Sequence, residues 1–162
     1  MKHLWAGWRS EYIESVGEDK RGCVLCRVIA DGEHVVWRGD RVAVILNAYP
    51  YTSGHVMVLP VRHVGEPEEL DGDEAAELWA TVTGAVVAIK AAYRPDGVNF
   101  GANLGAAAGA GVPGHFHVHA MPRWVGDTNF MTSVAEARVL PEPLSTTLEK
   151  LRKSWPEEPA TS

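Results

Sequence analysis

Short apolar runs near the start of the chain predict the first three strands of a sheet. Segments 34–37, 42–46 and 55–60 are rich in valine and other apolar residues, as is typical of strands. The first two are separated by a turn that contains Gly39-Asp40, which is a hairpin signal. Segment 47–54 separates the second run from the third and consists of turn-forming residues. Together these runs predict an antiparallel meander.

A longer segment, from Asp71 to about Tyr93, has the period of a helix. Its large apolar residues recur every three or four positions, at Leu78, Val82, Val86 and Ile89. Asp71 and Glu74 have the spacing of a capping box, in which each side chain accepts a hydrogen bond from the other residue's backbone. The pattern therefore predicts one long helix with a defined start.

The remaining segments complete a single domain of the α+β class. We expect strands at 98–103, 115–124 and, more briefly, 137–140, and short helices at 3–14 and 145–155. These elements predict an antiparallel sheet of five or six strands with one long helix and short terminal helices. The domain should span residues 1–155, and the polar residues 156–162 should form a disordered tail.

The predicted strand at 115–124 carries the most unusual chemistry in the chain. His115, His117 and His119 alternate with apolar residues, and side chains two apart on a strand point to the same face. Segment 105–114 just before them is mostly glycine and alanine, so an anion can approach its backbone N–H groups. Neutral imidazoles beside such a loop favour chemistry at a phosphate group. A metal site that uses all three imidazoles is the alternative.

Composition limits the classes of partner. The chain has 162 residues, 46% apolar, and a net charge of -6, which suits one globular domain and argues against broad binding to nucleic acids or anionic membranes. We expect no membrane span, and the charged residues Lys2, Arg9 and Glu11 are unlike a signal peptide. These features predict a cytoplasmic protein.

The only two cysteines, Cys23 and Cys26, form a Cys-x-x-Cys motif. In a reducing compartment this spacing indicates a metal knuckle or a redox pair rather than a structural disulfide. As a metal knuckle it supplies half of a four-ligand zinc site, so two more ligands must come from elsewhere in the chain.

Segment 115–121 resembles the histidine-triad (HIT) motif, in which three histidines alternate with apolar residues. The similarity extends to segments 4–13 and 122–131, to the Cys-x-x-Cys motif and to Gly54-His55-x-x-Val58-x-Pro60. In these segments the chain resembles a bacterial branch that contains diadenosine tetraphosphate phosphorylases and related HIT hydrolases. The resemblance implies a HIT-like fold and nucleotidyl transfer through a covalent nucleotidyl-histidine intermediate.

The resemblance also implies roles for individual residues. His117 would be the nucleophile that attacks the α-phosphorus of an adenosine polyphosphate or related nucleotide, because a neutral imidazole can attack without losing a proton first. Asn47 would contact the ribose. His119 and Asn103 would contact phosphate through their side chains, and Gly111 and Val112 would contact it through their backbone N–H groups.

In zinc-bearing members of the family the ligands are two cysteines, a histidine just after the third strand and the first triad histidine. The matching residues here are Cys23, Cys26, His63 and His115. The resemblance thus implies a closed Cys2His2 site for a structural Zn²⁺. Members of the family usually form homodimers, so a homodimer is expected as well.

Two positions bear on selectivity. Many family members carry Gln, Ser or Thr four residues before the first triad histidine, whereas this chain has Gly111 there. Loss of one such donor costs on the order of 3 kcal/mol at comparable sites. Unless a backbone N–H or a different leaving group compensates, we expect slower turnover of diadenosine substrates or specialisation for another substrate. Trp124, which follows a Pro-Arg step, could stack on the distal base or pack at the subunit contact.

Three other functions are compatible with the sequence. A non-catalytic or specialised nucleotide-binding protein would bind nucleotide without turnover, and a hydrolase of nucleoside phosphoramidates would use the same histidine on another leaving group. A metalloenzyme would use all three triad histidines as ligands. The choice between hydrolysis and phosphorolysis is likewise left open.

Overall fold

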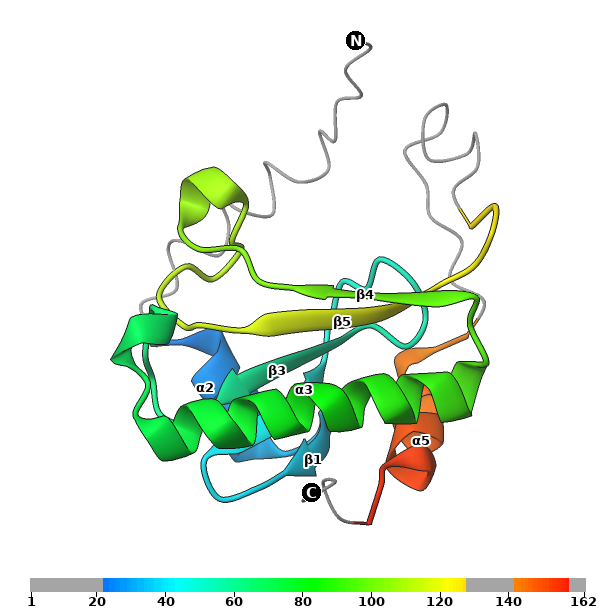
Figure 1. Cartoon of the computed structure of the whole chain (residues 1–162), viewed down its shortest axis with the longest axis horizontal. Helices are drawn as coiled ribbons and strands as arrows, with labels where there is room; N and C mark the ends of the chain where they lie inside the picture. The colour runs from blue at the N-terminus through cyan, green and yellow to red at the C-terminus, as the bar shows by residue number, and fades with distance from the viewer. Residues whose placement is uncertain (1–21, 128–141, 158–162) are drawn as a thin grey trace, which may run out of the picture.

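A five-stranded antiparallel sheet forms the centre of the computed structural model, which describes residues 22–127 and 142–157 (Figure 1). The strand order is β1-β2-β3-β5-β4. The strands are β1 (Val35–Arg38), β2 (Val42–Leu46), β3 (Val56–Pro60), β4 (Gly97–Gly101) and β5 (Val118–Arg123). The predicted meander of the first three strands is confirmed, and β5 lies between β3 and β4.

Helices cover both faces of this sheet. The longest, α3 (Gly72–Tyr93), runs across the front of the sheet in Figure 1. Among the described residues the other helices are α2 (Val24–Asp31), α5 (Leu144–Ser154) and the short 3-10 turns η1 (Pro67–Glu69) and η2 (Ala106–Ala108). The α+β class and the long central helix are therefore as predicted, with five strands among the described residues.

The start of α3 is fixed by the predicted capping box. The Glu74 backbone N–H donates to Asp71 Oδ1 over 2.8 Å, and the Asp71 N–H donates to Glu74 Oε2 over 3.0 Å. These bonds satisfy backbone donors that have no partner inside the first turn. By length and composition α3 could cross a membrane. It packs along the sheet through Leu78, Val82 and Ile89, however, so it is the core helix of this fold.

Alternation along the strands divides the apolar residues into two clusters. One cluster, which includes Val44, Val58 and Val118, packs against α3 and α5. The other lies on the opposite face and joins Ile45 and Met57 to Leu25 and Ile29 of α2. Since successive strand residues point to opposite faces, His119, which pairs with Met57, lies on the α2 face. This second face carries the candidate site.

The structure corrects several predicted boundaries. The last sheet strand begins at Val118, so His115 and His117 lie in the segment that leads into it and not within the strand. The fourth strand ends at Gly101 rather than at residue 103. Helix α2 was not predicted, because it begins inside the Cys-x-x-Cys motif, which was interpreted as a metal knuckle or a redox pair and not as the start of a helix. The predicted elements at 3–14 and 137–140 lie outside the described residues.

We predict that Asp71→Ala lowers the free energy of unfolding by about 1 kcal/mol, because the N-cap acceptor is lost. Asp71→Asn retains a side-chain oxygen and should stay close to the wild type. Asp73→Ala is the control, since Asp73 makes only an exposed ion pair with Arg41 at 3.2 Å. Urea denaturation measures all three, and equal losses for Asp71→Ala and Asp73→Ala would contradict the capping role.

Candidate functional site

His117 and His119 line a pocket between α2 and the sheet. Its wall includes Val24, Leu25 and Val28 of α2, Ile45, Asn47 and Met57 of the sheet side, and Gly111 and Val112 of the small-residue loop. Five of the predicted site residues thus meet in one pocket: Asn47, Gly111, Val112, His117 and His119. Apolar walls with a few convergent polar groups are typical of sites that hold a small molecule.

The His117 imidazole is held in one tautomer. Its Nδ1 lies 2.7 Å from the backbone carbonyl oxygen of His115. A carbonyl only accepts hydrogen bonds, so Nδ1 carries the proton and Nε2 carries the lone pair. Burial lowers the pKa of His117 below its ordinary value, partly opposed by this bond to His115. The ring is therefore neutral near pH 7 and presents Nε2 as a nucleophile.

His119 is oriented by a histidine that the sequence analysis did not assign to the site. The Tyr51 backbone N–H donates to His55 Nδ1 over 3.1 Å, so neutral His55 must carry its proton on Nε2. His55 Nε2 lies 3.0 Å from His119 Nδ1 and donates to it. The proton of neutral His119 is consequently on Nε2. The only sequence signal for His55 was its place after Gly54 in the shared motif.

Gly54 itself is required by the local backbone. Its φ of +88° lies in the left-handed region, and a Cβ there would come within 2.8 Å of the Tyr93 ring. A larger residue would displace either the ring or the following His55. The glycine therefore places His55 directly behind His119.

The four predicted metal ligands come together at the N-terminus of α2. The ligand atoms of Cys23, Cys26, His63 and His115 all lie within 4.8 Å of one another. Nδ1 of His115 lies 3.3 Å from Cys23 Sγ and 3.5 Å from Cys26 Sγ, and Nδ1 of His63 lies 3.4 Å from Cys26 Sγ. Tetrahedral zinc with ordinary bond lengths requires S–N spacings of roughly 3.5 Å. The cluster could therefore hold a metal ion.

The surroundings of this cluster also suit a metal. His115 is fully buried, and its Nε2 donates to the Pro60 carbonyl oxygen over 2.9 Å, which leaves the Nδ1 lone pair facing the cysteines. Burial and the neighbouring Cys23 raise the pKa of Cys26 to about 11. A metal ion that binds Cys26 as a thiolate would therefore have to displace its proton.

The small-residue loop folds on itself before it reaches the pocket. Its N–H groups at 108, 109 and 110 donate to carbonyls within the loop. Asn103 donates from Nδ2 to the Gly109 carbonyl oxygen over 3.4 Å and does not line the pocket of His117 and His119. Gly111 and Val112, beyond these internal bonds, do line it. The loop thus brings the predicted site residues Gly111 and Val112 to the pocket, and the Asn103 side chain stabilises the loop.

Comparison with known proteins identifies the family. The family model described as the HIT domain matches residues 30–125. The chain belongs to the HIT family. It is 46% identical over 169 residues to a Mycobacterium tuberculosis protein named AP-4-A phosphorylase, and the alignment covers 98% of this chain and 87% of that one.

Other matches include one solved structure with the same fold and a more distant relative in sequence. A crystal structure of a hypothetical histidine triad nucleotide-binding protein from Sulfolobus tokodaii has 32% identity and a TM-score of 0.68, covering 82% of this chain and 91% of that chain. The Schizosaccharomyces pombe bis(5'-nucleosyl)-tetraphosphatase (asymmetrical) is 33% identical over 96 residues, which are 59% of this chain and 52% of that protein. The HIT-like fold predicted from the sequence is therefore correct.

Trp124 stands apart from the pocket. Its ring meets that of Tyr93 edge to face, with centroids 6.4 Å apart, and its backbone N–H donates to Asp127 Oδ2 over 3.2 Å. Arg123 bonds both oxygens of the same carboxylate. Trp124 is thus fixed on a rigid turn at the end of β5, and within one chain it does not line the pocket of His117 and His119.

The α2 wall of the pocket is the second feature that sequence reasoning missed. Val24, Leu25 and Val28 line it, together with Tyr49 and Tyr51 from the loop after β2. Apolar residues in a short segment give no signal that separates a pocket wall from ordinary core. The helix therefore had to be observed before these residues could be assigned.

We predict that His55→Leu removes the fixed tautomer of His119. Without the Nε2–H donor, part of the His119 population should carry its proton on Nδ1. Long-range ¹H–¹⁵N NMR spectra report the protonated nitrogen of each ring. His34→Leu, which alters a histidine outside the pocket, should leave His119 unchanged. A His119 that stays fully Nε2-protonated in His55→Leu would show that His55 does not set its tautomer.

Proposed function

We propose that this HIT protein cleaves diadenosine polyphosphates by phosphorolysis through a nucleotidyl-histidine intermediate. The observation that carries the proposal is the position of His117, a neutral buried imidazole that lines the pocket and whose Nδ1 donates to the His115 carbonyl oxygen. Similarity along nearly the whole chain to a protein named AP-4-A phosphorylase favours this substrate and phosphate as the acceptor.

In the first step His117 Nε2 attacks the α-phosphorus of one adenylate. The new N–P bond replaces the bond from that phosphorus to the bridging oxygen, so diadenosine tetraphosphate releases ATP and leaves AMP on the ring. The proton stays on Nδ1 and remains hydrogen-bonded to the His115 carbonyl oxygen. This hydrogen bond stabilises the positive charge that the ring acquires. The histidine needs no separate base, because it is neutral before attack.

In the second step inorganic phosphate attacks the same phosphorus. The N–P bond breaks, ADP leaves, and His117 recovers its lone pair. The net reaction converts diadenosine tetraphosphate and phosphate into ADP and ATP. Water as the acceptor would instead give AMP, so the acceptor distinguishes a phosphorylase from a hydrolase.

The other pocket residues have binding roles in this proposal. The Nε2–H of His119 and the backbone N–H groups of Gly111 and Val112 are aimed at the phosphoryl oxygens, whose charge redistributes during transfer. Asn47 contacts the ribose, and Asn103, which also bonds the Gly109 carbonyl oxygen of the loop, contacts phosphate through its side-chain amide. The backbone donors offset the missing side chain at Gly111. Trp124 shapes a more distal part of the substrate site.

Product analysis tests the proposed reaction. With diadenosine tetraphosphate and phosphate, the wild type should form ADP and ATP in equal amounts, and His117→Ala should lose at least about a thousandfold in rate, as removal of a nucleophile does. Omission of phosphate should stop turnover or divert it to AMP and ATP. AMP as the product even with saturating phosphate would contradict phosphorolysis, and equal turnover by His117→Ala would contradict the covalent route.

We propose in addition that Cys23, Cys26, His63 and His115 hold a structural Zn²⁺. All four positions are filled by protein ligands, so this ion would fix the start of α2 beside the segment that carries His117 and would take no part in chemistry. The Nε2–H of His115, bonded to the Pro60 carbonyl oxygen, orients this ligand.

We expect one zinc ion per chain by elemental mass spectrometry of the purified protein. Cys26→Ser and His63→Ala should each lose it, whereas His117→Ala and His119→Ala should retain it, because their rings lie outside the cluster. If Cys26→Ser kept its zinc and His117→Ala lost it, the result would instead support a metal ion held by the three triad histidines.

We also propose a homodimer formed through β4. This strand is an edge of the sheet, and its Phe100 is 51% exposed and meets the exposed Trp79 of α3 edge to face. An edge strand beside exposed aromatic rings suits pairing with a second copy. A cytoplasmic location belongs to the same proposal, since Cys23 and Cys26 would stay reduced there.

A further inference from the structure

The segment from Pro60, the last residue of β3, to Val64 contacts both the Cys2His2 cluster and the segment that leads to His117. The Pro60 carbonyl oxygen accepts from His115 Nε2, and the Val64 carbonyl oxygen accepts from the Phe116 backbone N–H over 2.7 Å. Between them His63 supplies a candidate metal ligand. The position of this segment therefore determines where two of the four ligand side chains lie.

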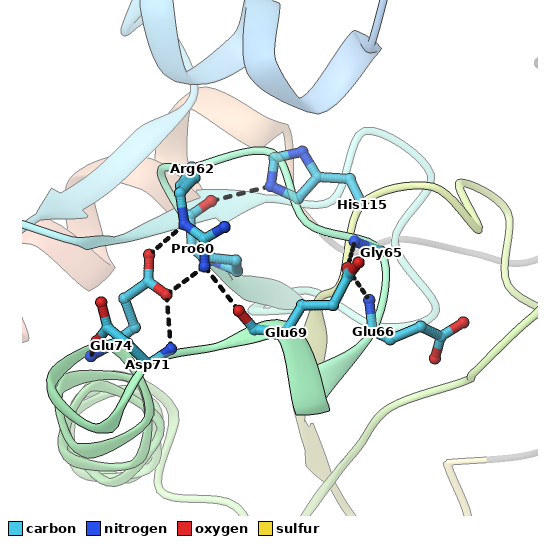
Figure 2. A network of polar contacts seen from close by, with 8 residues as sticks. All are labelled: Pro60, Arg62, Gly65, Glu66, Glu69, Asp71, Glu74 and His115. Carbon is cyan, nitrogen blue, oxygen red and sulfur yellow. Dashed lines mark hydrogen bonds and ion pairs between the residues drawn. The ribbon is translucent and has the colours of Figure 1, made fainter.

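The side chain of Arg62, in the middle of the segment, reaches toward Glu74 and Glu69 (Figure 2). Its Nε donates to Glu74 Oε1 over 2.8 Å and its NH2 nitrogen donates to Glu74 Oε2 over 2.7 Å. The same NH2 nitrogen also donates to the Glu69 carbonyl oxygen over 2.8 Å. A planar guanidinium bound through two parallel hydrogen bonds has a defined direction, which a lysine ammonium cannot reproduce.

Glu74 is a fixed anchor for this arginine. It is 5% exposed, and the Asp71 backbone N–H also donates to it over 3.0 Å as part of the cap of α3. The hydrogen bonds from Arg62 and Asp71 hold the pKa of Glu74 down to about 2, so it remains charged at neutral pH. The arginine therefore attaches the 60–64 segment to the rigid N-terminus of α3.

Glu69 of η1 also binds the chain just after the 60–64 segment. Its carboxylate accepts the backbone N–H groups of Gly65, over 2.9 Å, and of Glu66, over 3.1 Å (Figure 2). The chain on both sides of His63 is thus bound to side chains or carbonyls of η1 and α3. The Arg62 side chain is 53% exposed, but it bonds the Glu69 carbonyl oxygen as well as the buried Glu74 carboxylate, so it joins this segment to both η1 and α3.

We propose that Arg62 and Glu74 are a positioning pair for the metal centre. The pair holds His63, and the Pro60 carbonyl oxygen that orients His115, where both histidines and the two cysteines can bind the same ion. This inference rests on the proposed Zn²⁺ site. The pair touches neither the metal ligands' donor atoms nor the substrate pocket, and acts only through the backbone of the 60–64 segment.

The test measures zinc release from the full-length protein. Zinc-loaded protein is mixed with a chromophoric chelator, and the dissociation rate is compared with the free energy of unfolding of each variant. Arg62→Ala and Glu74→Gln should release zinc about tenfold faster than the wild type or more, as loss of an outer contact to a metal site does. Arg62→Lys should resemble Arg62→Ala, because the charge alone does not restore the paired bonds.

Two controls separate positioning from stability. Asp73→Ala breaks the exposed ion pair with Arg41 at the same end of α3, and Val36→Ala truncates a buried core residue on β1. Both should release zinc within about twofold of the wild type even where they lower stability. If Arg62→Ala released zinc at the same rate as Val36→Ala, the positioning role would be wrong, whereas the proposed zinc site would still stand. A wild type that binds no zinc would overturn the metal assignment and this inference together.

Discussion

The hydrogen bond from His117 Nδ1 to the carbonyl oxygen of His115 is the interaction on which the rest of the site depends. At 2.7 Å it settles which ring nitrogen is protonated, and burial keeps the ring uncharged. The acceptor is the backbone carbonyl of His115, and the His115 side chain lies against Cys23 and Cys26. One residue, His115, therefore links the candidate metal centre to the orientation of the nucleophile, through its side chain on one side and its backbone on the other.

The elements around the site serve more than one purpose. Helix α2 begins at the cysteine motif and continues as the apolar wall of the pocket, through Val24 and Val28. The helix α3 packs on the opposite face of the sheet, yet its capped N-terminus holds the segment that carries His63. The same short elements thus form the Cys2His2 cluster and the pocket, so a displacement of these elements would affect both sites.

Sequence reasoning succeeded where periodicity or side-chain chemistry was strong. The Asp71–Glu74 capping box, the meander and the helix up to Tyr93 followed from spacing alone. The family resemblance pointed to the four residues of the Cys2His2 cluster, which could hold a metal ion. It failed where a role depends on contacts between distant segments. The part played by His55 depends on a ring that lies 64 positions away in the chain. The start of β5 at Val118 depends on pairing with β3, which no local pattern specifies.

Detection of the covalent intermediate tests the account most directly. The protein would be mixed briefly with diadenosine tetraphosphate in the absence of phosphate, quenched at alkaline pH, where phosphoramidates persist, and digested for mass spectrometry. The account predicts one AMP adduct, on the peptide that contains His117 and assigned to that ring. An adduct on His119, or turnover of substrate with no adduct on any histidine, would contradict it.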